Sequence, residues 1–245
     1  MLHTFYGRGS TCFRFSPRIT VSPPKMRLLN TSTYIVEEFT GNDIPRYAIL
    51  SHRWGSQEIT FQDLQHFKNF RDYFKTRKST KTEGWLKIQH SCEQAVRDKL
   101  QWIWVDSCCI DKMSSAELSE AINSMFTWYR KAQVCYAYLS DVFIPWSEDG
   151  DRASYQFRNS RWFRRGWTLQ ELLAPRKLVF FSRTWVELGT RTDLWPFVSM
   201  TTGIRGEVGW EVASVAQKMS WASKRETTRS EDKAYSLMGL FGVNM

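Results

Sequence analysis

Short apolar runs recur along the chain, and each is followed by polar residues. Four runs have the length of a buried strand: 47–50, 102–105, 135–139 and 178–181. Runs without polar alternation are typical of strands that are covered on both faces of a parallel sheet. We therefore expect these four segments to be strands of one sheet.

Helical spacing of apolar residues fills most of the intervals between these runs. Apolar positions recur every three or four residues over 85–100 and 118–129. Ser114 and Glu117 precede the second stretch with the spacing of a capping box. The same criteria predict a loop over 145–156 and helices over 61–67, 162–173, 194–200, 212–222 and 231–240.

The order of these elements predicts an α/β fold with a mostly parallel central sheet flanked by helices and a more helical C-terminal part. Ligands of such sheets bind outside the carboxyl ends of the strands. His52, Arg53, Trp54 and Asp106 stand at these ends. Polar residues also follow strands simply because loops face water, so this placement alone does not separate a site from ordinary turns.

Residues 1–25 lack such patterning and contain Arg, Ser and Pro but no acidic residue. This composition fits a transit peptide or a dispensable extension before Met26, and we favour a poorly ordered extension followed by one domain over 26–245. No run of 18 apolar residues is present, so we expect no membrane span. Five cysteines without CxxC spacing favour reduced thiols and a cytoplasmic protein.

The net charge of +9 at first suggests a nucleic-acid partner. Residues 1–36 contribute +5 of it, which leaves +4 for the other 209 residues, and no basic run of five occurs. Nucleic acid is therefore not an expected partner. Binding through Arg161, Arg164 and Arg165 is only a weak third hypothesis.

Several familiar sites have no support in the sequence. It contains no GxGxxG, no GxxxxGK[ST] and no HExxH, and its His and Cys residues match no zinc spacing, so we expect neither a bound cofactor nor a metal. A cysteine hydrolase built from Cys108 or Cys109 with His52 and Asp106 is chemically possible. Adjacent cysteines after a strand are more often core residues.

Glu171 offers a different chemistry. It follows Trp167 by four residues, so both would share one face of the predicted 162–173 helix with Arg164. A carboxylate beside an indole can hold a flat cationic ring and can stabilise positive charge on a ribose while a glycosidic bond breaks. Release of nicotinamide from NAD requires such stabilisation of positive charge on the ribose. An ordinary amphipathic helix with a surface Glu–Arg pair fits the same residues.

Three motifs, over 47–55, 104–112 and 160–175, together resemble the fungal heterokaryon-incompatibility (HET) domain. The stretches 118–126 and 227–237 are also similar to that family, and the resemblance extends from about residue 26 to the end. Arg53 stands where many members have Thr, which is a modest departure.

The resemblance implies a cytoplasmic effector of fungal non-self recognition that triggers programmed cell death. Such domains stand alone or accompany NTPase and repeat domains, in the same chain or as partners. The family is also distantly similar to TIR domains, which implies a TIR- or flavodoxin-like core. The NAD-hydrolysing TIR domains use a glutamate in a WxxxE-like helix.

By this analogy Glu171 is the catalytic residue and NAD is a substrate. The expected substrate-binding residues are His52, Arg53, Trp54, Asp106, Arg164 and Trp167. The alternative is a death-signalling adaptor that acts by self-association without chemistry, with its surplus of aromatic residues supplying the contact surface.

Overall fold

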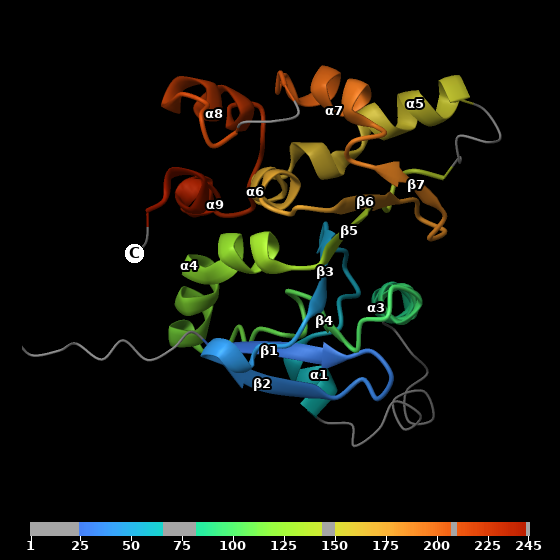
Figure 1. Ribbon diagram of the computed structural model, residues 1–245, viewed down its shortest axis with the longest axis vertical. Coiled ribbons are helices and arrows are strands. Elements are labelled where there is room, and N and C mark those ends of the chain that lie inside the picture. Colours follow the sequence, from blue (N-terminus) through green and yellow to red (C-terminus); the bar gives the residue numbers. More distant parts are fainter. Residues whose placement is uncertain (1–24, 66–81, 144–149, 207–209, 244–245) are drawn as a thin grey trace, which may run out of the picture.

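The centre of the protein is a seven-stranded sheet in the order β2-β1-β4-β3-β5-β6-β7 (Figure 1). The computed structural model describes residues 25–65, 82–143, 150–206 and 210–243. Its strands are β1 (Lys25–Asn30), β2 (Val36–Thr40), β3 (Tyr47–His52), β4 (Trp102–Trp104), β5 (Val134–Tyr138), β6 (Leu178–Phe181) and β7 (Glu187–Thr190).

The four predicted strands are the four neighbouring strands β4, β3, β5 and β6, which run parallel to one another. The antiparallel pairs lie outside them, β1 and β2 at one edge and β7 at the other. The predicted α/β class with a parallel core is therefore confirmed. The antiparallel edges make the whole sheet mixed.

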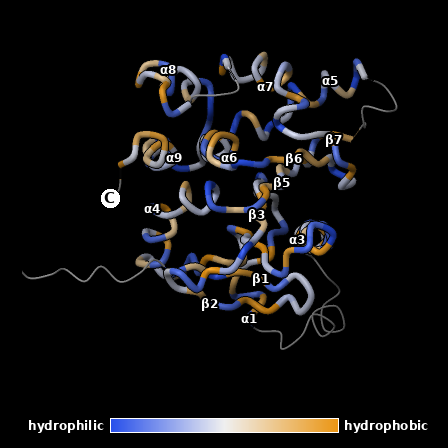
Figure 2. The backbone as a smooth tube through the Cα atoms, in the orientation of Figure 1, coloured by the Kyte–Doolittle hydropathy of each residue, from blue (hydrophilic) through white to orange (hydrophobic). Residues whose placement is uncertain are grey.

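Strand β3 lies in the middle of this core, and all six of its residues are buried. Helix α3 (Thr82–Arg97) contacts β4, whereas α4 (Ser115–Lys131), α6 (Thr168–Leu173) and α9 (Asp232–Phe241) pack against one another on the other side of β3 in Figure 1. In Figure 2, hydrophobic and hydrophilic positions alternate along most of these helices. This pattern is typical of amphipathic helices that bury one face.

The remaining helices are α1 (Phe61–Gln65), α5 (Gly150–Asn159), α7 (Trp195–Thr202) and α8 (Val215–Ala222), with short 3-10 turns η1 (Gly41–Asp43) and η2 (Arg161–Arg164). Every predicted helix has a helical counterpart. The loop predicted over 145–156 is wrong from Gly150 onward, because α5 occupies that stretch and buries Ala153 and Phe157 despite its polar composition. Residues 144–149 lie outside the described residues.

The single helix predicted over 162–173 is also wrong, because η2 and α6 are separated there. Arg165 has an extended backbone, with φ −75° and ψ 136°. Gly166 donates its amide to the carbonyl of Glu226 at 2.7 Å, and Glu226 donates back to Arg164 at 2.6 Å. These two bonds to a distant segment replace helical bonds, and the chain turns between η2 and α6.

The start of α4 matches its prediction only in part. Ser114 accepts the Glu117 amide as an N-cap should, but the Glu117 carboxylate accepts from the Asp111 amide at 2.8 Å and pairs with Arg27, which draws β1 toward α4. No helix in the described part of the chain is long and apolar enough to cross a membrane. The extension over 1–25 lies outside the described residues except for Lys25, and its boundary stays a prediction.

Candidate functional site

Two polar side chains meet where the parallel strands β3 and β4 end. His52 is the last residue of β3, and Asp106 follows β4 by two residues. The Nε2 atom of His52 lies 3.6 Å from Oδ1 of Asp106. The neighbouring strand ends thus bring together two of the residues that the sequence placed there.

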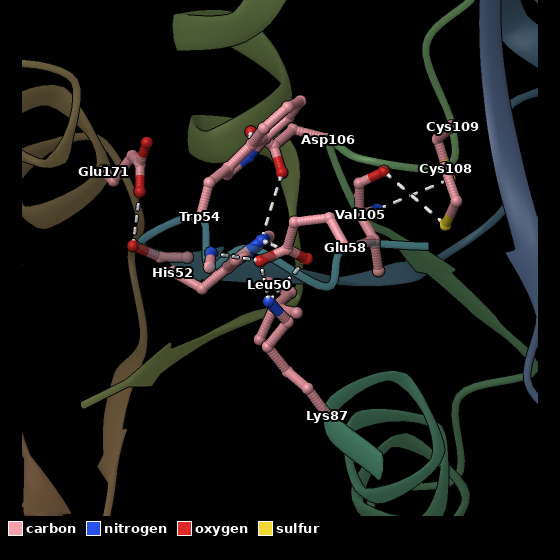
Figure 3. A network of polar contacts seen from close by, with 12 residues as sticks. Leu50, His52, Trp54, Glu58, Lys87, Val105, Asp106, Cys108, Cys109 and Glu171 are labelled. Carbon is pink, nitrogen blue, oxygen red and sulfur yellow. Dashed lines mark hydrogen bonds and ion pairs between the residues drawn. The ribbon is translucent and has the colours of Figure 1, made fainter. Parts of the chain in front are cut away.

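Behind His52 lies a buried ion pair that the sequence did not predict (Figure 3). Lys87 Nζ of α3 donates to both carboxylate oxygens of Glu58, at 2.5 Å and 2.6 Å. His52 Nε2 lies 3.5 Å from Glu58 Oε2, and Gly55 donates its amide to Oε1 at 2.7 Å. Glu58 therefore stands between a lysine and a histidine with its charge well compensated.

Close approach of α3 makes this pair possible. A Cβ atom at Gly84 would lie 1.9 Å from the carbonyl oxygen of Gln57, so only glycine fits there. Lys87 follows Gly84 by one helical turn and reaches Glu58 from the contact point. The pair therefore depends on packing between segments far apart in sequence.

The charge states follow from these contacts. Burial raises the pKa of Glu58, but the contacts with His52 and Lys87 outweigh it and hold this pKa below its usual value. Burial, with Lys87 nearby, lowers the pKa of His52. Burial also lowers the pKa of Lys87, against the contact with Glu58, which raises it. At neutral pH the imidazole of His52 is therefore neutral and lies beside the Glu58–Lys87 pair.

Glu171 of α6 lies apart from Glu58 in Figure 3 and has a different set of partners. Ser51 donates its hydroxyl to Glu171 Oε2, and Trp162 Nε1 donates to the Ser51 oxygen at 2.9 Å. Arg165 Nη1 lies 3.3 Å from Glu171 Oε1. Since Trp162 occupies the serine oxygen as a donor, the hydroxyl proton is directed at the carboxylate.

Glu171 is only 2% exposed, and its environment changes its acidity. Burial raises the pKa of Glu171 to about 7, although Arg165 and Ser51 act in the opposite direction. A carboxyl group with this pKa is present in both protonation states at neutral pH. That property suits a group that accepts and releases protons.

The accessible part of the site surrounds Asp106. Trp54 is 43% exposed and donates its indole N–H to Asp106 Oδ2 at 2.8 Å. Lys112 Nζ lies 3.0 Å from the centre of the Trp54 ring, and Arg165 Nη2 lies 3.9 Å from Asp106 Oδ2. Arg165 thus contacts both the partly buried Asp106 and the buried Glu171.

The other predicted site residues lie further from these contacts. Arg53 and Arg164 are exposed, and Arg165 holds the position beside Glu171 that the continuous helix would have given to Arg164. Trp167 is buried at the start of α6, and in the described part of the chain no ring contact or side-chain hydrogen bond joins it to Glu171. The indole linked to Glu171 by hydrogen bonds is that of Trp162, which donates to Ser51, and Ser51 donates to Glu171.

The cysteines and metal ligands offer little. Cys108 is fully buried, and its contact with Cys109 together with burial raises the pKa of its thiol, which disfavours the thiolate that a cysteine hydrolase needs. Among the described residues no three His, Cys, Asp or Glu side chains converge on a possible metal position. Two of the three arginines considered for nucleic acid are engaged elsewhere, Arg161 with Asp141 and Arg165 with Glu171.

Comparison with known proteins bears on the part of the chain that carries this site. Residues 47–143 match the family model of the heterokaryon incompatibility protein (HET). The matched segment contains Ser51, His52 and Asp106. The chain is similar to the vegetative incompatibility protein HET-E-1 of Podospora anserina, with 43% identity over 217 residues. That match covers 85% of this chain but only 15% of the relative.

No solved structure matches the chain significantly. The family match and the relative agree with the motifs over 47–55 and 104–112, and the 217 aligned residues extend well beyond the segment that the family model matches. The protein therefore contains a fungal heterokaryon-incompatibility (HET) domain.

Proposed function

We propose that this chain is an effector domain of heterokaryon incompatibility that hydrolyses the nicotinamide–ribose bond of NAD at Glu171. The incompatibility role is supported by the family match and by the name of the Podospora relative. The hydrolytic activity rests on one observation, a buried carboxyl group with a pKa of about 7 at the functional edge of a parallel sheet.

The proposed reaction uses groups that the site contains. The glycosidic C–N bond breaks, its electron pair leaves with nicotinamide, and water adds to the ribose carbon. Ionised Glu171 stabilises the oxocarbenium-like centre, accepts the proton of the attacking water and releases it to solvent. Ser51, oriented by Trp162, keeps the reacting oxygen of the carboxylate in place.

Trp54 and Asp106 supply the binding surface of this proposal. The indole of Trp54 is exposed enough for a nicotinamide ring to stack on it, and the carboxylate of Asp106 attracts the positive charge of that ring before cleavage. Glu171 itself is covered, and its ion pair with Arg165 must open before substrate reaches it. Arg165, freed in that step, can bind the pyrophosphate.

Release of nicotinamide tests this function directly. Concentrated protein is incubated with NAD, and free nicotinamide is measured for the wild type, for Glu171→Gln and for Glu187→Gln, which changes an exposed glutamate on β7. We expect turnover in the wild type and the Glu187 variant and a loss of at least about 100-fold in the Glu171 variant. Equal turnover by Glu171→Gln, or none by wild type at any protein concentration, would refute the hydrolase.

One observation favours the adaptor as a second candidate. Large apolar side chains are exposed along the C-terminal part, among them Met200, Val212 and Val215, and such surfaces often mediate association. An adaptor would kill cells with Glu171→Gln as effectively as with wild type, whereas Val212→Glu combined with Val215→Glu would abolish killing. A cell-death assay with both variants separates the two candidates.

A further inference from the structure

A cavity of about 500 Å³ lies beside the C-terminal end of α6. It is bordered by Arg130 near the end of α4, by the segment from Leu173 to Arg176 before β6, and by residues on either side of a gap in the described chain, within 204–206 and 210–221. Arg130 and the Leu173–Arg176 segment precede β5 and β6, whereas His52 ends β3 and Asp106 follows β4, so the cavity lies at the opposite edge of the parallel strands. Its volume is within the range of small-molecule sites.

The lining of this cavity is strongly basic. Four arginines and one glutamate, Glu211, are among the described lining residues: Arg130, Arg176, Arg191 and Arg205. Arg191 donates to the carbonyl of Leu172 at 2.6 Å and is partly used by the fold. In the described part of the chain, Arg130, Arg176 and Arg205 form no ion pair, so their guanidinium groups are available to an anion.

The same cavity presents three indoles. Trp195 and Trp210 are partly exposed, and Trp221 is buried behind them. Trp210 is held in place by an edge contact with Phe126 at 5.2 Å between ring centres. Indole faces attract planar rings, and stacking of a nucleobase on an aromatic side chain contributes about 1–3 kcal/mol.

Guanidinium groups and indoles around one volume suit a ligand that is both anionic and planar. We propose that this cavity binds a nucleoside triphosphate, with its base among Trp195, Trp210 and Trp221 and its phosphates on Arg130, Arg176 and Arg205. This proposal does not rest on NAD hydrolysis, since the lining includes neither Glu171 and Asp106 nor Ser51, Trp54 and Arg165, which contact them.

Three probes test the ligand class on the whole chain. ATP, tripolyphosphate and adenosine are titrated separately while intrinsic tryptophan fluorescence and heat are recorded. We expect saturable ATP binding with quenching, and at least tenfold weaker binding of tripolyphosphate and of adenosine. No saturation by ATP, or tripolyphosphate binding as tightly as ATP, would overturn the proposal.

Charge reversal tests the location. Arg130→Glu and Arg205→Glu change exposed side chains, so the fold should survive, which a thermal melt checks. Each should weaken ATP binding at least tenfold, whereas Arg97→Glu, an exposed arginine of α3, should leave it unchanged. Equal weakening by all three variants, or by none, would place the ligand elsewhere. Nicotinamide release by the same variants is scored separately, so failure of one proposal does not carry over to the other.

Discussion

Glu58 and Glu171 are both buried beside strand β3, yet their surroundings shift their acidities in opposite directions. Glu58 receives two short contacts from Lys87 and a backbone amide, and its pKa lies below the usual value. Glu171 receives the Ser51 hydroxyl, a smaller contribution from the Tyr129 hydroxyl and a single guanidinium contact at 3.3 Å, and burial raises its pKa to about 7. Glu58 is 7% exposed and Glu171 is 2% exposed, so deeper burial and weaker partners together raise the pKa of Glu171 above that of Glu58.

This difference separates structural from functional use of a buried acid. A carboxylate whose charge is fully compensated stays ionised and holds segments together, as Glu58 holds α3 against the turn after β3. A carboxylate that is only partly compensated keeps a proton available near neutral pH. The site therefore combines a permanent ion pair with a titratable acid.

Breaking the buried Glu58–Lys87 ion pair should have the largest effect on stability. Lys87→Met leaves a charge buried without its cation, so we expect the free energy of unfolding to fall by about 3–5 kcal/mol in urea denaturation. The matched control is Lys25→Met, which breaks the exposed Lys25–Glu38 pair at 3.0 Å and should cost less than about 1 kcal/mol. Similar losses in both variants would show that the buried pair has no special weight.

The pH dependence of stability sharpens the comparison. Glu171 has a folded pKa of about 7, above the ordinary 4.5, so the folded state binds more protons between these values and loses stability as pH rises through them. Relative to Glu171→Gln, the wild type should lose about 3 kcal/mol between pH 4.5 and pH 8. Glu58 acts oppositely, because its lowered pKa adds stability that is lost only as pH falls below about 4.5.

Urea titrations at pH 4.5 and pH 8 measure this difference. Parallel pH profiles for the wild type and Glu171→Gln would contradict the raised pKa of Glu171.

Removing a single donor should have the smallest effect. Ser51→Ala deletes the hydroxyl that stabilises ionised Glu171, so the pKa of Glu171 should rise further and the ionised form should lose about 1–2 kcal/mol. The shift is followed by carbon NMR of labelled glutamate carboxyl groups during a pH titration. Ser91→Ala, which removes a buried hydroxyl bonded to the Ile88 carbonyl, serves as control and should leave the titration unchanged.

The central strands could be predicted because burial on both faces leaves a direct mark on sequence. Tyr47–Leu50 and Leu178–Phe181 contain no polar residue, and both form central strands. Edge strands carry no such mark. Strand β2, Val36–Thr40, mixes glutamates with apolar residues, has no buried position, and depends on pairing with β1.

The site was predictable only where topology alone determines it. Parallel strand ends bring His52 to Asp106. Arg165 rather than Arg164 lies beside Glu171 because the chain turns at Gly166. Backbone hydrogen bonds with Glu226, about 60 residues away, create this turn. Lys87 reaches Glu58 through the contact at Gly84, and no local pattern in α3 indicates a buried ion pair.

Arg225 has a consequence for dissection of this protein. Its buried guanidinium donates to the carbonyl of Arg165 at 3.1 Å and to the hydroxyl of Thr168 at 2.9 Å, and its Nε donates to the carbonyl of Trp221. Hydrogen bonds from this C-terminal residue thus stabilise the turn that positions the Arg165 side chain. A fragment limited to 47–143, the segment that the family model matches, would lack both Glu171 and the residues that hold this turn. A fragment that keeps the turn must include Arg225 and Glu226.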